Sequence, residues 1–331
     1  MDETRLYGSD PEFFIYKNTI NTIYGDIPNI VPPASLIADM GVKFTVSSNN
    51  KRILIDKPDY KVIEDGAALE INFKKPFNNT TQLHHTYYQA KDTIQKFLYG
   101  IDMHLKLSED VLGFFNIKDY WEGRDENFID CVRFGCDPDT FPKLYSMSGF
   151  EKDVCKIIDA SKHEYRYAGG HIHIQNMTDN PDIYLDNLEY APIVLDFIVG
   201  TINVLLDRGQ KIKTQELARL KYYGRPGRVR LQKYSENKNG IEYRPPSNQW
   251  ITDTYSTNAI LQSASIAAHI IERNMAKEFY LEFKGSISKM WDALTCHNKD
   301  LSSTLLVDSI VWALNNNLVT LKDVEVIYGK F

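Results

Sequence analysis

Two imidazoles alternate with two apolar residues in the segment Gly169-Gly170-His171-Ile172-His173-Ile174. Successive side chains of a β-strand point to opposite faces, so the pattern predicts His171 and His173 on one face and buried isoleucines on the other. The two glycines before the strand allow a tight turn or the close approach of another group. Paired imidazoles suit a metal ion, a phosphate group or proton transfer, although a surface strand with two histidines has the same sequence.

Two carboxylates lie two residues apart in Asp10-Pro11-Glu12, at the start of a strand predicted over residues 10–17. This spacing places Asp10 and Glu12 on the same side of the strand. Carboxylate oxygens held by a rigid strand are suitable ligands for hard cations such as Mg²⁺. A polar strand end, with Pro11 marking its start, is the alternative interpretation.

A second strand that carries a carboxylate is predicted over residues 67–73, after a turn at Asp65-Gly66. Its alternation places Glu70 and Asn72 on one face, with apolar residues on the other. A solvated antiparallel sheet has the same pattern. This segment alone therefore does not distinguish a cation site from a polar surface.

The densest run of basic residues lies between Arg219 and Arg230. Gly224, Pro226 and Gly227 predict a turn within it. Guanidinium groups arranged around a turn suit a polyphosphate, or the charge that develops during phosphoryl transfer. A solvated loop and a contact to the phosphates of nucleic acid are the alternatives.

An acid and a guanidinium group are again two residues apart at Glu242 and Arg244, in a strand predicted over residues 240–244. They form either a salt bridge worth less than about 1 kcal/mol, or a cation ligand beside a phosphate clamp. The chain contains no GxxxxGK[ST] and no strand–GxGxxG–helix motif. A nucleotide would therefore have to be held by metal and arginine.

The chain that must position these residues has the composition of an ordinary globular protein. The chain has 331 residues, 43% of them hydrophobic and 25% charged, which is enough for a sizeable core. The net charge of −6 argues against a protein that coats nucleic acid. The four cysteines show no CxxC spacing and are expected to be reduced thiols. The N-terminus has no apolar segment and no apolar run is long enough to span a bilayer, which predicts a cytoplasmic protein without a membrane partner.

The periodicities predict a single α+β domain over residues 1–331. A helix capped by Thr80 or Thr81 is expected to run to Ile101, with its apolar residues in the core. Residues 20–60 are expected to form short strands and loops. Further helices are expected over residues 187–206, 256–282, 286–294 and 303–315, and a last strand over residues 324–328. Since helices separate only some of the strands, the sheet is expected to be largely antiparallel.

Six motifs in sequence order resemble a phage-associated group of carboxylate–amine ligases of the glutamine-synthetase and glutamate–cysteine-ligase superfamily. They span residues 8–280, while residues 281–331 are expected to be a helical extension. The motifs are Gly8-Ser9-Asp10-Pro11-Glu12-Phe13-Phe14, Asp65-Gly66 with Glu70-Ile71-Asn72, Phe134-Gly135-Cys136-Asp137-Pro138-Asp139, Ala168-Gly169-Gly170-His171-Ile172-His173, Tyr223-Gly224 with Gly227 and Arg230, and Gly240-Ile241-Glu242-Tyr243-Arg244 with Ser247-Asn248 and Trp250.

The resemblance implies a glutamine-synthetase-like catalytic fold. Its open, curved, largely antiparallel sheet would have helices on the convex face and ATP with two or three Mg²⁺ ions, or Mn²⁺ instead, on the concave face. The implied metal ligands are Glu12, Glu70, His171 and Glu242. The implied groups that bind ATP are His173, Arg219, Arg225 and Arg228. The implied catalytic residues are Arg230 and Arg244, together with Asp10 and Asp65, which would orient ligands or accept a proton from the amine.

The activity implied by the resemblance is the ATP-dependent joining of a carboxylate to an amine through an acyl phosphate. The substrates would be small molecules or peptides, in the host cytoplasm if the chain is phage-encoded. Nucleic acid is not an expected partner, and a homo-oligomer is compatible with the sequence. The alternatives are a metal-dependent phosphohydrolase and an inactive structural or nucleic-acid-contacting phage protein. A ligase would require ATP, whereas a hydrolase would not.

Overall fold

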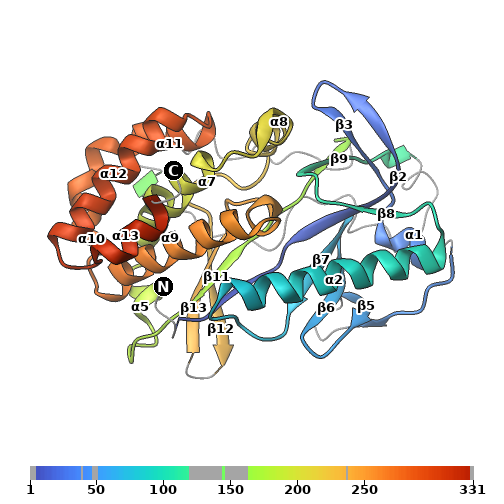
Figure 1. Cartoon of the computed structure of the whole chain (residues 1–331), viewed down its shortest axis with the longest axis horizontal. Coiled ribbons are helices and arrows are strands. Elements are labelled where there is room, and N and C mark those ends of the chain that lie inside the picture. Colours follow the sequence, from blue (N-terminus) through green and yellow to red (C-terminus); the bar gives the residue numbers. More distant parts are fainter. Residues whose placement is uncertain are drawn as a thin grey trace.

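The computed structural model describes residues 5–38, 40–46, 51–118, 144–145, 163–235 and 238–328. Among these residues the strands form two open sheets (Figure 1). The smaller sheet has the order β1-β11-β13-β12, and all its pairs are antiparallel. Its strands are β1 (Tyr7–Ser9), β11 (Ile172–Gln175), β12 (Val229–Ser235) and β13 (Lys238–Tyr243).

The larger sheet has the order β10-β9-β3-β2-β7-β6-β5-β4, and β8 also pairs with β2. All its pairs are antiparallel except β3 with β9. Its strands are β2 (Glu12–Thr22), β3 (Gly25–Ile30), β4 (Thr45–Val46), β5 (Arg52–Asp56), β6 (Tyr60–Asp65), β7 (Ala68–Phe73), β8 (Lys106–Ser108), β9 (Leu112–Phe114) and β10 (Tyr165–Tyr167). The predicted α+β class with largely antiparallel strands is therefore confirmed, but the strands form two hydrogen-bonded sheets instead of the single sheet that was expected.

The chain passes from the smaller to the larger sheet at Asp10-Pro11, between the end of β1 and the start of β2. Two backbone hydrogen bonds fix this crossing. Pro11 O accepts from Ile71 N at 3.0 Å, and Glu12 N donates to Gly169 O at 2.9 Å. The strand predicted over residues 10–17 therefore begins only at Glu12. Asp10 contacts His171 beside the smaller sheet, whereas Glu12 pairs with Glu70 in the larger one.

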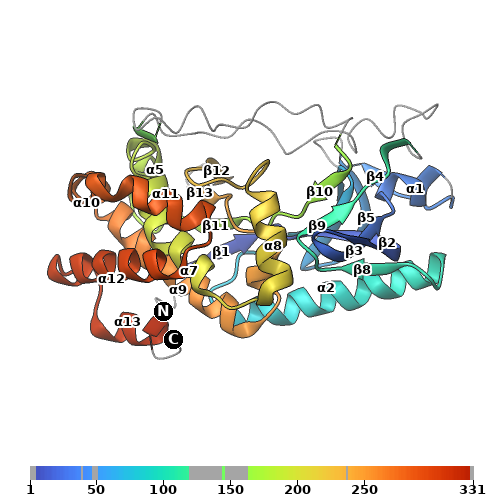
Figure 2. The same cartoon turned by 90° about the horizontal axis from the view of Figure 1, so that it is seen from above.

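Helix α2 (Thr80–Ile101) and helix α9 (Thr254–Glu272) lie on the same side of the strands (Figure 2). The N-cap of α2 is Asn79, whose side chain accepts from Gln82 N at 2.8 Å, so the cap precedes the predicted threonines by one residue or more. Of the apolar residues that recur at helical spacing in α2, Leu83, Tyr87, Ala90 and Ile94 are fully buried in the main core, as predicted, whereas Phe97 and Ile101 are half-buried against it. The same core includes residues of both sheets and of the C-terminal helices.

The helix predicted over residues 256–282 is two helices, α9 and α10 (Ala276–Phe283). They are separated at Asn274, which has a positive φ of 57°. Asparagine tolerates this left-handed conformation better than most residues and therefore ends helices. Helix α11 (Ile287–Thr295) agrees with the segment predicted over residues 286–294, whereas α12 (Lys299–Asn315) begins four residues before the predicted start at 303.

The prediction of a strand over residues 324–328 is wrong, because these residues belong to helix α13 (Leu321–Tyr328). The β-branched residues there suggested a strand. A capping box overrides that preference: Thr320 N donates to Asp323 Oδ2 at 2.9 Å, and Asp323 N donates back to Thr320 Oγ1 at 3.4 Å. Helix α13 also packs on α9.

Around the helix predicted over residues 187–206, the chain forms three consecutive pieces, α6 (Ala191–Leu195), a π-helical turn (Asp196–Gly200) and α7 (Thr201–Leu205). The buried Asp196 in this turn accepts from the hydroxyls of Tyr145 at 2.6 Å and Tyr243 at 2.7 Å. Burial raises the pKa of Asp196 to about 7. The other helical elements are α1 (Pro33–Ala38), α5 (Ile183–Asp186), α8 (Gly209–Arg219) and the 3₁₀ turns Asn248–Ile251 and Lys284–Ser286.

Two further expectations concern membrane-spanning helices and the cysteines. No helix among the described residues is long and apolar enough to cross a membrane. Cys296 is a free, exposed thiol, as expected. Cys131, Cys136, Cys155 and the motif over residues 134–139 lie outside the described residues.

Gly170 is expected to tolerate no side chain, because a Cβ there would lie 2.5 Å from Ser247 O and 2.7 Å from Asn248 Cα. Gly170→Ala must push this backbone away and is expected to lower the free energy of unfolding by about 1–3 kcal/mol. Chemical denaturation measures the loss. Gly285→Ala is the control, since a Cβ at Gly285 meets nothing within 4 Å. Equal stability of the two variants would contradict the close approach.

Candidate metal centre

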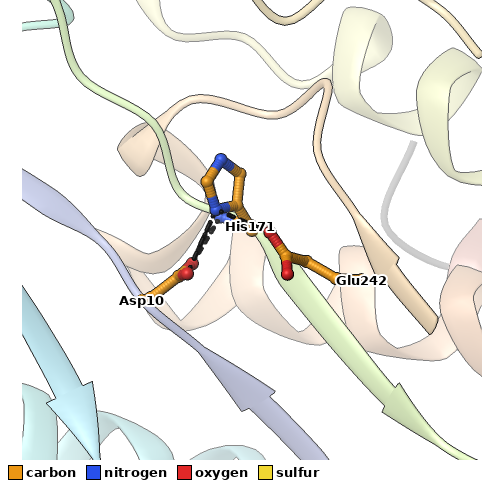
Figure 3. Close-up of side chains that lie close together, drawn as sticks. All are labelled: Asp10, His171 and Glu242. Carbon is orange, nitrogen blue, oxygen red and sulfur yellow. Dashed lines mark hydrogen bonds and ion pairs between the residues drawn. The ribbon is translucent and has the colours of Figure 1, made fainter. Parts of the chain in front are cut away.

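The first group of candidate ligands consists of Asp10, His171 and Glu242, which the smaller sheet brings together (Figure 3). One ligand atom from each residue lies within 4.8 Å of the others. His171 Nδ1 is 3.0 Å from Asp10 Oδ1 and 3.2 Å from Glu242 Oε1. The backbone N–H of His171 also donates to Asp10 Oδ1 at 3.2 Å, so Asp10 fixes both the backbone and the ring. We call these three residues the first cluster.

The second group, which we call the second cluster, consists of Glu12, Asp65 and Glu70 in the larger sheet. Glu12 on β2 and Glu70 on β7 are direct partners in the register of the two strands. Both side chains are buried, with only 6% of each residue exposed. Like charges directly opposite each other destabilise a sheet. The pair is therefore costly unless a cation or a proton compensates one of the two charges.

The two clusters meet at Gly169. Its backbone N–H donates to Glu12 Oε2 at 2.7 Å. A Cβ at this position would lie 3.2 Å from both Glu12 Oε1 and His171 Nε2. The absence of a side chain thus lets a ligand of each cluster approach the same point of the backbone, as the Gly-Gly pair suggested.

The surroundings set the charges of the second cluster. Burial, followed by the charge of Asp65, raises the pKa of Glu12 to about 7. The same two causes raise the pKa of Glu70 well above its usual value. In metal-free protein Glu12 is therefore partly protonated near neutral pH.

The first cluster is charged differently. Burial alone would raise the pKa of Asp10, but the imidazoles of His171 and His173 outweigh it and lower that pKa. Burial opposes the cationic form of His173, yet the Asp10 carboxylate raises its pKa overall. His173 Nε2 lies 3.4 Å from Asp10 Oδ2. Both histidines therefore face Asp10, which confirms that they share one face of the strand.

Lys51, just before β5, places a cation in the second cluster. Its Nζ is 2.7 Å from Asp65 Oδ1 and 3.3 Å from Glu70 Oε2. Asn72 Nδ2 donates to the other oxygen of Glu70 at 3.4 Å, so Glu70 and Asn72 share a face as predicted. The ammonium group of Lys51 stands in for part of the positive charge that the acids require.

Basic groups border the first cluster. Arg244 Nη1 donates to Glu242 Oε1, which confirms that these two residues share a face of β13. Arg230 Nη1 lies 3.8 Å from Glu242 Oε2, and Gln232 Nε2 donates to the same oxygen. A guanidinium pair thus lies directly beside the acids of the candidate metal centre.

Tyr223 links the imidazole of His171 in the first cluster to the guanidinium group of Arg244 beside it. His171 Nε2 lies 2.7 Å from the Tyr223 hydroxyl, and Arg244 Nη2 donates to that hydroxyl at 3.4 Å. The sequence drew attention to Tyr223 only as part of the Tyr223-Gly224 motif. Nothing in the sequence indicated that Lys51 and Gln232 belong to the site, because each is a single polar residue whose partners lie on other strands.

The structure gives Arg219 and Arg225 partners other than the expected phosphate. The fully buried Arg219 donates from Nη1 to Pro245 O at 2.6 Å and from Nη2 to Pro246 O at 3.1 Å. Arg225 donates from Nε to Leu220 O at 3.0 Å. Both guanidinium groups therefore fix backbone around the site.

Arg228 is half-buried in the turn before β12, and its backbone carbonyl accepts from Arg244 N at 3.1 Å. Arg230, in the same basic segment, lies next to a cluster acid, with its Nη1 3.8 Å from Glu242 Oε2. The structure thus brings together the predicted acids, His171, His173, Arg230 and Arg244.

The donor set fits a divalent hard cation in chemical terms. Five carboxylates and one imidazole supply the ligand atoms of the two clusters, and such oxygen-rich sets suit Mg²⁺ or Mn²⁺. The buried register pair Glu12–Glu70 is the observation that favours a cation most directly. No protein-family model matches the chain, and none of the curated proteins compared with it gives a match.

A divalent cation is expected to stabilise the folded protein more at pH 8 than at pH 6. Because folding raises the pKa of Glu12 from 4.5 to about 7, the protonated form contributes stability below pH 4.5, and this contribution is lost as the pH rises through about 7. A cation must displace that proton, so its apparent affinity falls about tenfold per pH unit below 7 for one proton. Thermal unfolding with and without Mn²⁺ at pH 6, 7 and 8 measures the effect. Equal Mn²⁺-induced shifts at all three values would contradict it.

Proposed function

We propose that this chain is an ATP- and Mg²⁺-dependent carboxylate–amine ligase with a glutamine-synthetase-like catalytic fold. The observation that carries the proposal is the meeting of two acid clusters at Gly169, with a buried Glu12–Glu70 register pair on one side and Arg230 and Arg244 on the other. Two buried sets of acids beside guanidinium groups are what a polyphosphate substrate with its cations requires.

The chemistry needs an activated carboxylate, because the oxygen of a free carboxylate is a poor leaving group. An oxygen of the carboxylate substrate forms a bond to the γ-phosphorus of ATP, and the bond from that phosphorus to ADP breaks. The amine then attacks the carbonyl carbon of the acyl phosphate, and inorganic phosphate leaves with the bonding electrons of the C–O bond. The amine nitrogen loses one proton, so an amide, ADP and phosphate are the products. Divalent cations, when bound, neutralise the charge of the phosphate oxygens.

Each residue has a role that its contacts support. Glu12, Glu70, His171 and Glu242 are the proposed metal ligands. Arg244, held in place by Glu242 and Tyr223, and Arg230 face the negative charge that develops on the transferred phosphoryl group. Asp10 orients His171 through two contacts, and Asp65 lies beside Glu70, where it is a candidate to accept the amine proton.

A coupled assay tests the ligase directly. Purified full-length protein, Mg²⁺ and ATP are incubated with a pool of amino acids and small peptides, and ADP is measured together with products whose mass equals a condensation of two components. ADP release that requires both Mg²⁺ and an added amine supports the proposal. Neither ADP nor condensation product across the pool, with the cation bound, would refute it for these substrates.

A metal-dependent phosphohydrolase is the second candidate, because two adjacent cation sites also activate water for phosphate ester cleavage. The observation that favours it is the side-by-side position of the two clusters at Gly169. Release of phosphate from a simple ester without ATP would select this function. An inactive chain would bind the cation without either reaction.

A further inference from the structure

The ammonium group of Lys51 lies among the acids of the second cluster. Its Nζ is 2.7 Å from Asp65 Oδ1 and 3.3 Å from Glu70 Oε2. Together with Glu12, each of these two acids offers a carboxylate oxygen, and the three oxygens lie within 4.8 Å of one another. Lys51 therefore contacts two of the three candidate ligands of one cation.

The ammonium group and a divalent cation would compete for these acids. Because Mg²⁺ binds carboxylate oxygens at about 2.1 Å, an ion on Asp65 Oδ1 would lie within about 5 Å of Lys51 Nζ in its present position. Two positive charges this close repel each other. Solvent screens the repulsion poorly, since only 7% of the Glu70 side chain is exposed. The ion and the ammonium group therefore exclude each other from the cluster.

The side chain of Lys51 can leave the cluster while the strand beside it stays in place. It is 31% exposed, and its four-carbon stem is flexible. The next residue, Arg52, begins β5 and is held firmly, because its Nη2 donates to Glu64 Oε1 on β6 at 2.8 Å. The movement thus requires a change in one side chain only.

The charges of the cluster favour such an exchange. Burial, followed by the charge of Asp65, raises the pKa of Glu70, whereas the charge of Lys51 lowers it. Lys51 brings one positive charge to three carboxylates. A doubly charged ion compensates them better and binds several of their oxygens at once.

We propose that Lys51 is an intramolecular counter-ion, which pairs with the acids of the second cluster in metal-free protein and withdraws when a divalent cation binds. It thereby sets the cation concentration at which the cluster fills. The inference rests on the cation site of the proposed function, but not on the ligase reaction. A lysine that only arranged the acids would act in the opposite direction, since its loss would weaken cation binding.

The test titrates full-length protein with Mn²⁺ at pH 8, without nucleotide, by isothermal calorimetry. The wild type is compared with Lys51→Gln, which removes the charge, and with Lys51→Arg, which keeps it. Lys74→Gln is the matched control, because the Lys74 side chain is 29% exposed and pairs with Asp56, outside both clusters. Lys51→Gln is expected to bind Mn²⁺ about fivefold more tightly than the wild type, as for the loss of one competing ion pair, and the other two variants within about twofold of it.

A second measurement uses the wild-type chain and so does not depend on how the variants fold. Limited acetylation with acetic anhydride, followed by peptide mass spectrometry, gives the rate of modification of Lys51, with Lys74 as the internal reference. Saturating Mn²⁺ is expected to raise the rate at Lys51 several-fold and to leave the rate at Lys74 unchanged.

Equal or weaker Mn²⁺ binding by Lys51→Gln overturns the inference, as does an acetylation rate at Lys51 that Mn²⁺ does not raise. The gain in affinity is expected to disappear in a Glu70→Gln background. Its persistence there would place the ion outside the second cluster and would also overturn the inference. Absence of Mn²⁺ binding by all these proteins refutes the proposed cation site and the inference with it, whereas tighter binding by Lys51→Gln without ligase activity supports the inference and counts against the ligase alone.

Discussion

Glu70→Gln is expected to stabilise the metal-free protein and to abolish its stabilisation by Mn²⁺. In the wild type, Glu70 and Glu12 are buried register partners, and burial raises the pKa of both. Removal of one of the two facing carboxylates relieves their repulsion, so at pH 8, above the pKa of Glu12, the free energy of unfolding is expected to rise by about 1 kcal/mol. The same change removes a ligand of the second cluster. Thermal unfolding at pH 8, in EDTA and in Mn²⁺, measures both effects.

The control for this variant is Glu278→Gln, which makes the same chemical change at an exposed position of α10. Its stability in EDTA and its Mn²⁺-induced shift are expected to equal those of the wild type. If Glu70→Gln kept the full Mn²⁺-induced shift, the second cluster would not be a cation site. If the variant were less stable than the wild type in EDTA, the pairing of Glu70 with Lys51 would outweigh its repulsion from Glu12.

The faces of the individual strands were predictable from the sequence, because a strand has a period of two residues. The period placed His171 with His173, Glu70 with Asn72, and Glu242 with Arg244, and each pair shares a face in the structure. The apolar face of α2 was predictable for the same reason, with the helical period. Local patterns thus specified which side chains point together within one element.

Contacts between different helices and strands could not be predicted from these local patterns. Nothing in the local sequence shows that Asp10 follows a strand of one sheet while Glu12 begins a strand of the other. Lys51 reaches Glu70 only because β5, β6 and β7 are neighbours. The turn from Arg219 to Arg230 was predictable, but the direction of Arg219 was not. Gly224 lacks a side chain, and the Arg219 guanidinium lies so close to it that a Cβ would stand 2.1 Å from Nη1.

The sequence-based predictions of helix boundaries were wrong where one polar residue outweighed the secondary-structure propensity of its neighbours. The capping box of Thr320 and Asp323 turned a β-branched segment into α13. The left-handed Asn274 divided a segment of uniform helical propensity into α9 and α10. In both cases a side chain or backbone conformation at a single position decides where a helix begins or ends, whereas propensity is summed over many residues.

Glu242→Gln is expected to lower the rate of ADP formation at least about a hundredfold, the loss typical of removing a group that organises charge around a reacting phosphate. Glu242 is 1% exposed and contacts His171 at 3.2 Å, Arg230 at 3.8 Å and Arg244. Its loss removes a metal ligand and frees Arg244 from its fixed position. Because it also leaves a buried guanidinium without its carboxylate, the free energy of unfolding is expected to fall by about 3 kcal/mol. Steady-state kinetics and chemical denaturation of the same preparation measure the two losses.

The variant Glu272→Gln is the control that separates the catalytic effect of Glu242→Gln from its effect on stability. Glu272 forms a buried bidentate pair with Arg5, with N–O distances of 2.7 and 2.6 Å, on the end of α9 and outside both clusters. This variant is expected to lose a similar free energy of unfolding, since it breaks the same kind of pair, but to keep its turnover within about twofold at temperatures where it is folded. Equal losses of turnover in the two variants would show that Glu242 acts through stability alone. Full turnover in Glu242→Gln would remove the first cluster from the proposed metal centre, because a buried acid that holds both an imidazole and a guanidinium cannot be dispensable to a reaction that these groups carry.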